Sequence, residues 1–332
     1  MPAVSVLLPV RNGEATIRPA LRSILRQRLR DLELVVVDDR SSDGTRAILE
    51  EEAARDPRLH VVEGEGRGIV AALERGRARC TSPFVARMDA DDVAHPLRLQ
   101  EQLELLAGRP ELDGVGCEVA MFPPQRVQEG MRRYVAWLNS LRSAEDVERE
   151  RFIESPLVHP AVMLRAETLA KVGGWVERGW PEDYDLWLTM IAAGARLANL
   201  PKLRLFWREH GRRLTRTDPR YGKARHLALK ARHLAPLLRE GGCGIWGAGK
   251  TGRALSRALA AEGVRPFYFV DVDPRKIGRR LHDAPILGPR QLPARGGPPL
   301  LVAVAFRGAR EEIRADLLAA GWIEGRDFFC CA

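Results

Sequence analysis

The sequence predicts an α/β protein whose first part contains a mostly parallel sheet. Short apolar runs alternate with stretches of helical spacing, in the order βαβαβαβ over residues 4–88. Runs such as Leu34–Val37 are apolar at every position, which is typical of strands covered on both faces. With 332 residues, of which 45% are hydrophobic and 29% charged, the chain can bury a sizeable core and form two domains.

The first seven elements follow one another closely. We expect them at Val4–Val10, Ile17–Leu29, Leu34–Val37, Thr45–Ala54, His60–Val62, Ile69–Arg79 and Phe84–Met88. Residues 97–150 have mainly helical spacing with a loop at Pro123–Pro124, and residues 155–207 are mixed. Residues 222–240 predict a basic amphipathic helix, which is either a packed connecting helix or a membrane-surface helix, because Leu227, Leu234 and Leu238 need a partner.

Composition narrows the classes of partner. The net charge of +9 is spread along the chain, which favours acidic or phosphate-bearing ligands and gives no support to nucleic acid. Five cysteines at scattered spacings indicate reduced thiols in a cytoplasm. Because no run approaches the roughly 20 apolar residues of a membrane helix, we expect any membrane contact to be peripheral, at the inner face.

Polar residues cluster where the predicted strands end. Arg11 and Asn12 follow the first strand, Asp38 and Asp39 follow the second, and an acidic run at residues 89–92 follows the fourth. Ligands of parallel sheets bind beyond the carboxyl ends of the strands, so one crevice could gather all of these residues.

The acidic run contains Asp89, Asp91 and Asp92. In an extended segment Asp89 and Asp91 point the same way and can reach one divalent cation, and Mg²⁺ or Mn²⁺ would leave coordination places for phosphate oxygens. The alternative is an Asx turn, or a cap for a helix at Leu97–Leu106.

The second strand is followed by a further acidic cluster. Ser41, Ser42 or Asp43 can cap the next helix, so Asp38 and Asp39 are not needed for that cap. A carboxylate at a strand end can accept a hydrogen bond from a nucleobase or a ribose hydroxyl. The two acidic clusters together therefore suit a nucleoside and its diphosphate.

The C-terminal part carries two overlapping glycine motifs. Residues 244–251 satisfy the P-loop pattern, and Gly247, Gly249 and Gly252 satisfy the dinucleotide-binding pattern. A P-loop needs a preceding strand, and residues 239–243 make a poor one, so the second motif is favoured. Asp271, about 20 residues beyond the turn, fits a ribose-binding acid for a nucleotide or NAD. A nucleotide fold that binds nothing is the alternative.

Five segments together resemble family 2 glycosyltransferases, whose GT-A fold binds a nucleotide-diphosphate sugar. They are SVLLPVRNGEATIRPALRSILRQ, LELVVVDDRSSDGT, MDADD, HPAVMLRAETLAKVGGW and PEDYDLWLTM, and the match covers residues 3 to about 215. The segments GAGKTGRAL, FVDVDP and PILGP resemble small Rossmann-like modules attached to sugar-modifying enzymes. We therefore expect a GT-A domain at 1–215, a basic linker helix at 216–240 and a Rossmann-like domain at 241–332.

The resemblance implies an inverting, metal-dependent glycosyltransferase of cell-surface polysaccharide or lipopolysaccharide assembly. It implies a UDP-sugar donor in preference to others, a glycan or lipid-linked acceptor, and Mn²⁺ or Mg²⁺. The implied nucleotide-binding residues are Pro9, Arg11, Asn12, Asp38, Asp39, Gly68 and Asp89. Asp89, Asp91 and His210 are the implied metal ligands, and Asp183 is the implied catalytic base. The structural alternatives are that Asp183 only caps a helix at Leu186–Ala193 and that His210 is a packing residue.

Some positions depart from the family pattern. Glu74 stands where relatives usually have asparagine, and the Q-x-x-R-W signature of processive synthases is absent, which favours transfer of one sugar at a time. His159, Trp175 and Trp180 could line the acceptor side or serve packing. Two other functions are considered. A nucleotide-sugar pyrophosphorylase would need a glycine-rich loop after the first strand, and a non-catalytic nucleotide or NAD sensor would depend on the C-terminal module.

Overall fold

The computed structural model describes residues 1–238 and 242–332, which form two units. Unit 1 comprises Met1–Glu148, Pro156–Arg178 and Glu182–Thr217, and unit 2 comprises Arg149–Ser155, Gly179–Pro181 and Asp218–Ala332. The predicted boundary between residues 240 and 241 lies outside the described residues, as do the last two residues of the predicted linker helix.

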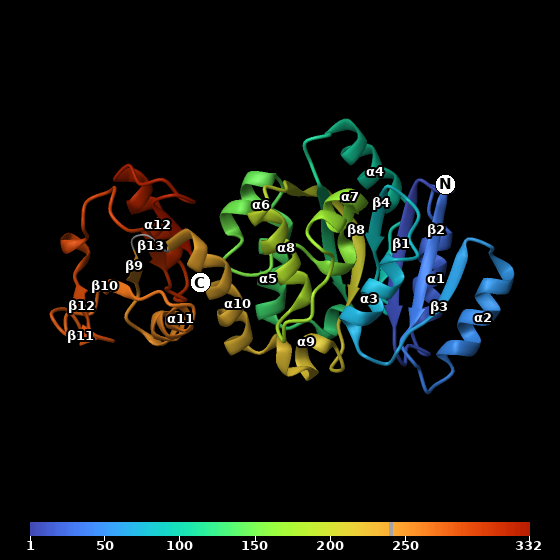
Figure 1. Cartoon of the computed structure of the whole chain (residues 1–332), viewed down its shortest axis with the longest axis horizontal. Helices are drawn as coiled ribbons and strands as arrows, with labels where there is room; N and C mark the ends of the chain where they lie inside the picture. The colour runs from blue at the N-terminus through green and yellow to red at the C-terminus, as the bar shows by residue number, and fades with distance from the viewer. Residues whose placement is uncertain (239–241) are drawn as a thin grey trace. The chain divides into compact units, whose positions relative to one another are not determined.

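Unit 1 is built on an eight-stranded sheet with the strand order β3-β2-β1-β4-β7-β6-β8-β5. Figure 1 labels β1, β2, β3, β4 and β8 of this sheet. The strands are β1 (Val4–Val10), β2 (Leu32–Asp38), β3 (Leu59–Glu63), β4 (Phe84–Arg87), β5 (Val93–Ala94), β6 (Gly114–Phe122), β7 (Met163–Arg165) and β8 (Leu197–Arg208). The first four strands in the order are parallel, as predicted. Strand β7 is antiparallel to β4 and β6, and β5 is antiparallel to β8, so the whole sheet is mixed.

Helices α1 (Ile17–Leu25) and α4 (Arg98–Gly108) pack on one face of this sheet, and α3 (Ile69–Arg77) and α8 (Glu182–Ala192) pack on the other. The other helices in this part of the chain are α2 (Thr45–Arg55), α5 (Glu129–Ser140), α6 (Ala144–Glu150), α7 (Ala166–Lys171) and α9 (Leu214–Thr217). In β1, Val6 and Leu8 belong to one buried cluster, with residues of α1 and α4, whereas Leu7 belongs to another, with residues of α3 and α8. This double coverage is the reason why the strand is apolar at every position except the buried Ser5, which donates to Glu33.

Residues 97–150 are mainly helical, as predicted, with α4, α5 and α6, but they also contain strand β6, which was not predicted. Its first residues, Gly114 to Cys117, are buried in the sheet next to β7 and β8. A Cβ atom at Gly114 would lie 2.5 Å from Leu164 Cδ2, and one at Gly116 would lie 2.1 Å from Asn199 Oδ1. Glycine is required by this crowding, yet it is depleted in strands generally, so the sequence pattern hides the strand.

Unit 2 contains a six-stranded sheet with the order β11-β12-β10-β9-β13-β14. Its strands are β9 (Cys243–Trp246), β10 (Pro266–Val270), β11 (Arg280–Leu281), β12 (Ala284–Leu287), β13 (Leu300–Val302) and β14 (Phe328–Cys330), and its helices are α10 (Lys223–Leu238), α11 (Lys250–Ala261) and α12 (Ala309–Ala319). Helix α10 packs on α11 and buries Leu229, Leu234 and Leu238. Of the three leucines predicted to need a partner, Leu234 and Leu238 are buried and Leu227 is partly buried. Among the described residues, no helix has the length and apolarity needed to span a bilayer.

The short segment Arg149–Ser155 is an integral part of unit 2 although it lies far from it in the chain. Glu150 Oε1 lies 2.8 Å from Arg314 Nη2, and the same guanidinium lies 2.8 Å from Glu324 Oε1. The Phe152 ring packs edge-on against Phe329, with ring centroids 5.8 Å apart. Unit 2 therefore depends on residues that are translated before most of its own sheet.

Candidate active site

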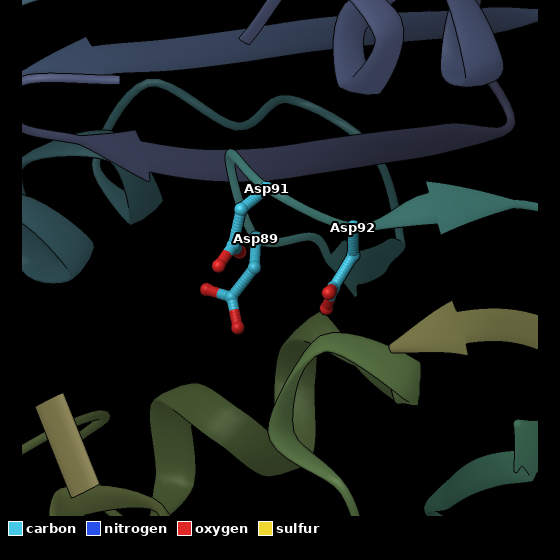
Figure 2. Close-up of side chains that lie close together, drawn as sticks. All are labelled: Asp89, Asp91 and Asp92. Carbon is cyan, nitrogen blue, oxygen red and sulfur yellow. The ribbon is translucent and has the colours of Figure 1, made fainter. Parts of the chain in front are cut away.

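The acidic run forms a tight turn between β4 and β5. Ala90 and Asp91 are in the turn rather than in the extended conformation that the sequence suggested. The carboxylates of Asp89, Asp91 and Asp92 nevertheless project to the same side, as Figure 2 shows, and offer oxygen atoms within 4.8 Å of one another. Helix α4 begins at Arg98 without a side-chain cap, so the acidic residues do not serve as its cap.

Each carboxylate of the turn has a different environment. Asp91 Oδ2 lies 2.6 Å from His210 Nε2, and Asp89 is paired with the guanidinium of Arg87. Asp92 is only 1% exposed; its Oδ1 accepts a hydrogen bond from the Arg208 backbone N–H at 2.7 Å. Its Oδ2 is buried without a hydrogen-bond partner among the described residues. Asp92 therefore joins the cluster as a third acid.

The acidic turn fits a divalent cation. Burial raises the pKa of Asp91, and the nearby Asp89 carboxylate raises it further. Burial also raises the pKa of Asp92 well above its usual value, with Asp89 and Asp91 adding to the shift. Such crowding of acids is costly unless a positive charge compensates it. Carboxylate ligands suit Mn²⁺ or Mg²⁺, and the unpartnered Asp92 oxygen points to the same need.

The predicted nucleotide side lies on the same edge of the sheet. The loops that contain Asn12, Asp39 and Asp89 follow β1, β2 and β4, three adjacent parallel strands. A Cβ atom at Gly13 would lie 3.7 Å from Ala90 Cβ, so the loop after β1 lies against the acidic turn. The structure thus brings together segments that are far apart in the sequence.

Two buried aspartates organise these loops. Asp39 Oδ1 accepts a hydrogen bond from the Gly66 N–H at 2.7 Å, and Oδ2 accepts one from the Gly68 N–H at 2.9 Å. Asp38 accepts the Ser41 N–H at 3.0 Å. Both carboxylates are 4% exposed. Any contact of Asp39 with a nucleobase would therefore use the oxygen lone pairs that remain.

The polar residues around them serve the loops or face open space. Asn12 adopts a left-handed conformation, with φ of 56°, and its Oδ1 accepts the Ser42 N–H at 2.8 Å. Asp43, one of the predicted cap residues, accepts the Thr45 N–H at 3.0 Å at the start of α2.

The other predicted nucleotide-binding residues lie nearby in the sequence of loops. Pro9 lies in β1 opposite Val37. No atom lies within 4 Å of a Cβ built at Gly68, which leaves room for a ligand there. Arg11 is exposed in the loop after β1.

Asp183 lies in the first turn of α8. The helix starts at Glu182, earlier than the predicted Leu186, and Asp183 Oδ1 accepts the N–H of the next residue, Tyr184, at 2.8 Å. Burial raises the pKa of Asp183 to about 7, and the adjacent Glu182 contributes to the shift. A carboxylate with a pKa near neutrality is suited to act as a general base.

The candidate acceptor residues of unit 1 are packed in its interior. Trp175 is 2% exposed, and its Nε1–H donates to His159 Nε2 at 3.0 Å. His159 is 6% exposed, and burial lowers its pKa well below the usual value. Glu74 accepts the Trp175 backbone N–H at 2.7 Å and pairs with Arg77, so it ties α3 to this segment. These observations favour packing over an acceptor role. The third candidate, Trp180, belongs to unit 2.

The glycine turn of unit 2 follows β9. Gly247 has φ of 118°, and a Cβ atom at Gly252 would lie 1.8 Å from Gly247 O, so α11 packs directly on the turn. Nothing lies within 4 Å of a Cβ built at Gly249. Asp271 accepts the Ala248 N–H at 3.0 Å and lies 2.9 Å from Lys276 Nζ. Its carboxylate is thus already engaged with the turn.

Arg87 was not among the site residues predicted from the sequence, and Asp92 was not among the predicted metal ligands. Arg87 ends an apolar strand, where a charged residue of 2% exposure has no packing reason to be. An arginine directly before an acidic run is the signal that could have identified it.

Comparison with known proteins agrees with this geometry. Residues 5–173 match the family described as "Glycosyl transferase family 2". The amylovoran biosynthesis glycosyltransferase AmsE of Erwinia amylovora is 30% identical over 200 residues, which are 59% of this chain and 73% of AmsE. The putative glycosyltransferase EpsE of Bacillus subtilis is 30% identical over 206 residues, which are 60% of this chain and 70% of EpsE.

Solved structures show the same fold. TarS 1–349 of S. aureus in complex with UDP-GlcNAc has a TM-score of 0.57 at 18% identity, covering 77% of this chain and 71% of that chain. The mannosyltransferase PcManGT from Pyrobaculum calidifontis, in complex with GDP-Man and Mn²⁺, has a TM-score of 0.55 at 22% identity, covering 79% and 74%. The mixed α/β sheet is that of GT-A glycosyltransferases, and the chain belongs to glycosyltransferase family 2.

Proposed function

We propose that this chain is an inverting, metal-dependent, non-processive glycosyltransferase. It moves a sugar from a nucleotide-diphosphate donor to a hydroxyl of a glycan or lipid-linked acceptor. The observation that carries the proposal is the acidic turn with His210, placed at the sheet edge where β1, β2 and β4 end. Family membership favours this function over the pyrophosphorylase and sensor alternatives.

The transfer step forms one bond and breaks another at the anomeric carbon. The acceptor oxygen attacks this carbon from the face opposite the diphosphate, and the bond to the diphosphate oxygen breaks with its electron pair leaving on the nucleoside diphosphate. Asp183 takes the acceptor hydroxyl proton during the attack. Asp89, Asp91 and His210 would hold a divalent cation, with Asp92 adjacent. When bound, that cation supplies charge stabilisation for the leaving diphosphate.

The donor side is proposed from the loops after β1, β2 and β3. Asp39 holds the backbone of the loop that ends at Gly68, and Asp38 and Asn12 order the loops next to it. Pro9, Arg11 and Asp89 complete the proposed nucleotide contacts. One structural neighbour binds UDP-GlcNAc and another binds GDP-Man, so a UDP-sugar is proposed first and GDP-sugars are the main competitors.

The biological setting is proposed from the relatives. AmsE is named for amylovoran biosynthesis, and a Bacillus subtilis relative is named as a putative teichuronic acid glycosyltransferase. This supports assembly of a cell-envelope polysaccharide at the cytoplasmic side of the membrane. Leu229, Leu234 and Leu238 of α10 are buried, whereas Leu237 is exposed.

The direct test is a panel of nucleotide sugars with and without Mn²⁺. We expect one donor to raise the melting temperature only when Mn²⁺ is present, because a ligand that binds the folded state stabilises it. The same donor should then be hydrolysed slowly and transferred to a suitable acceptor with inversion, as followed by NMR of the anomeric proton. A protein that binds no nucleotide sugar under any of these conditions would contradict the proposal.

The rate of transfer should depend on pH through Asp183. The base is active when deprotonated, and its pKa is raised from about 3.8 to about 7. We therefore expect kcat to fall as the pH drops below about 7, and to level off above it. The Glu182→Gln variant removes the neighbouring charge that helps to raise this pKa, so its acid limb should move to lower pH. If kcat falls over the same pH range in the wild type and in Glu182→Gln, Asp183 is not the titrating base.

Nucleotide binding by unit 2 is a separate proposal. The open position at Gly249 and the positive φ of Gly247 support it. The engagement of Asp271 with Lys276 means that a ribose hydroxyl would have to compete with an ion pair. NAD and UDP can be compared by calorimetry on the Asp91→Asn variant, in which nucleotide binding at the acidic turn is weakened.

A further inference from the structure

Two buried arginines lie behind the acidic turn. Arg87, the last residue of β4, is 2% exposed, and Arg98, the first residue of α4, is fully buried. The Arg98 guanidinium donates to Gln102 Oε1 at 3.2 Å and to the Arg87 carbonyl at 2.6 Å, both of which are neutral acceptors. Buried arginines are uncommon, and apolar residues of similar volume often stabilise a core equally well. Their presence therefore calls for a reason other than stability.

Arg87 lies within electrostatic range of both halves of the site. Its Nη1 contacts Asp89 Oδ1, and its Nε has no hydrogen-bond partner among the described residues. Asp89, Glu182 and Asp92 all act on its charge. In the opposite direction, the charge of Arg87 lowers the pKa of Asp183. One fixed cation is thus shared by the acidic turn and by the start of α8.

The two arginines weaken the attraction of the acidic turn for a cation that binds alone. The turn carries three carboxylates, and two permanently charged guanidinium groups lie behind them. A divalent ion that enters the turn meets repulsion from Arg87, whereas the phosphates of a donor are attracted by the same charge. A cation that arrives together with a diphosphate gains both interactions. The fixed charge therefore couples the two ligands, and such coupling is reciprocal.

We propose that Arg87 is a positioning residue of the transfer site, which holds the Asp89 carboxylate and makes cation binding depend on the nucleoside diphosphate. The inference rests on the proposed function. Arg87 touches neither reacting atom in this proposal and acts through Asp89 and through its charge. The charged and titratable groups that interact with it are Asp89, Asp92 and Arg98 at the turn, Glu182 and Asp183 on α8, and the buried His159.

The test is calorimetry of Mn²⁺ binding to the full chain, with and without UDP, or GDP if the wild type prefers it. In Arg87→Met, which keeps the length and removes the charge, Mn²⁺ alone should bind roughly 10-fold or more tightly than in the wild type. The factor by which the diphosphate strengthens Mn²⁺ binding should shrink. Arg87→Lys keeps the charge, so its affinity for Mn²⁺ alone should stay close to that of the wild type.

A purely structural role predicts a different pattern. The matched control is Arg165→Met, because Arg165 donates to the carbonyls of Leu106 and Leu112 and not to the acidic turn. This variant should lose stability without tighter binding of Mn²⁺. If Arg87→Met lowers the melting temperature while Mn²⁺ affinity falls or stays the same, the inference is overturned. If Arg87→Met does not fold, tighter Mn²⁺ binding by Arg87→Lys than by the wild type would overturn it.

The pH profile gives an independent readout. Loss of the Arg87 charge should raise the pKa of Asp183 further, so the acid limb of kcat in Arg87→Met should move above pH 7. An unchanged limb would count against the shared charge. Wild-type protein that transfers no sugar would contradict the proposed function, whereas the Mn²⁺ and diphosphate titrations would still decide the role of Arg87.

Discussion

Replacement of Asp183 by asparagine is expected to lower kcat by about 10²- to 10⁴-fold, the usual contribution of a general base. Asparagine has nearly the same shape and can still accept the Tyr184 N–H, so the start of α8 should persist. It cannot take a proton from the acceptor. The loss should therefore appear in kcat and leave donor affinity close to that of the wild type, as measured by single-turnover kinetics and calorimetry.

The control for this variant is Glu167→Gln, an exposed acid in the first turn of α7. It removes a carboxylate from a helix start without touching the proposed site, and it should transfer sugar at the wild-type rate. The role of Asp183 would have to be abandoned if Asp183→Asn, correctly folded by circular dichroism, also kept the wild-type rate.

The Asp91→Asn variant should lose affinity for Mn²⁺ by more than the about 10- to 100-fold typical of residues that only support a ligand. Asp91 is the carboxylate that lies against His210, and an amide oxygen carries no full charge to attract the ion. We expect the loss in binding assays by electron paramagnetic resonance of Mn²⁺. Transfer should fall with it.

Asp31→Asn is a suitable comparison, because Asp31 is exposed just before β2. Its Mn²⁺ affinity should match that of the wild type. Undiminished Mn²⁺ binding by Asp91→Asn would mean that the ion, if one binds, sits elsewhere. Together, the Asp91 and Asp183 variants separate metal binding from proton transfer.

Local pattern was sufficient to predict the first half of the fold. Strands β1 to β4 are built largely from apolar residues, and the helices between them have regular spacing, so β1 was predicted with its observed bounds, Val4–Val10. Strand β6 was missed because its glycines are required by neighbours that come from β7 and β8, about 50 and 80 residues later. Packing against residues that are distant in the chain cannot be recognised from a short stretch of sequence.

The candidate site shows the same division. Asp89, Asp91 and His210 were predicted from a family pattern, and the structure places Asp91 next to His210. The engagement of both Asp39 oxygens by the loop at Gly66–Gly68, and the interior position of His159 and Trp175, depend on packing between segments. Arg87 illustrates the limit best, because its importance comes from burial and from charges on another element.

The discontinuous construction of unit 2 has a consequence for how this polypeptide can be divided. During translation, Glu150 and Phe152 are synthesised long before Arg314 and Phe329. These two side chains therefore have no partners until the end of the chain has been made. A gene cut after residue 217 would encode that segment without the surface that shields it. We therefore expect a fragment that ends at this point to be less stable than the full chain, because Glu150 and Phe152 lose their partners.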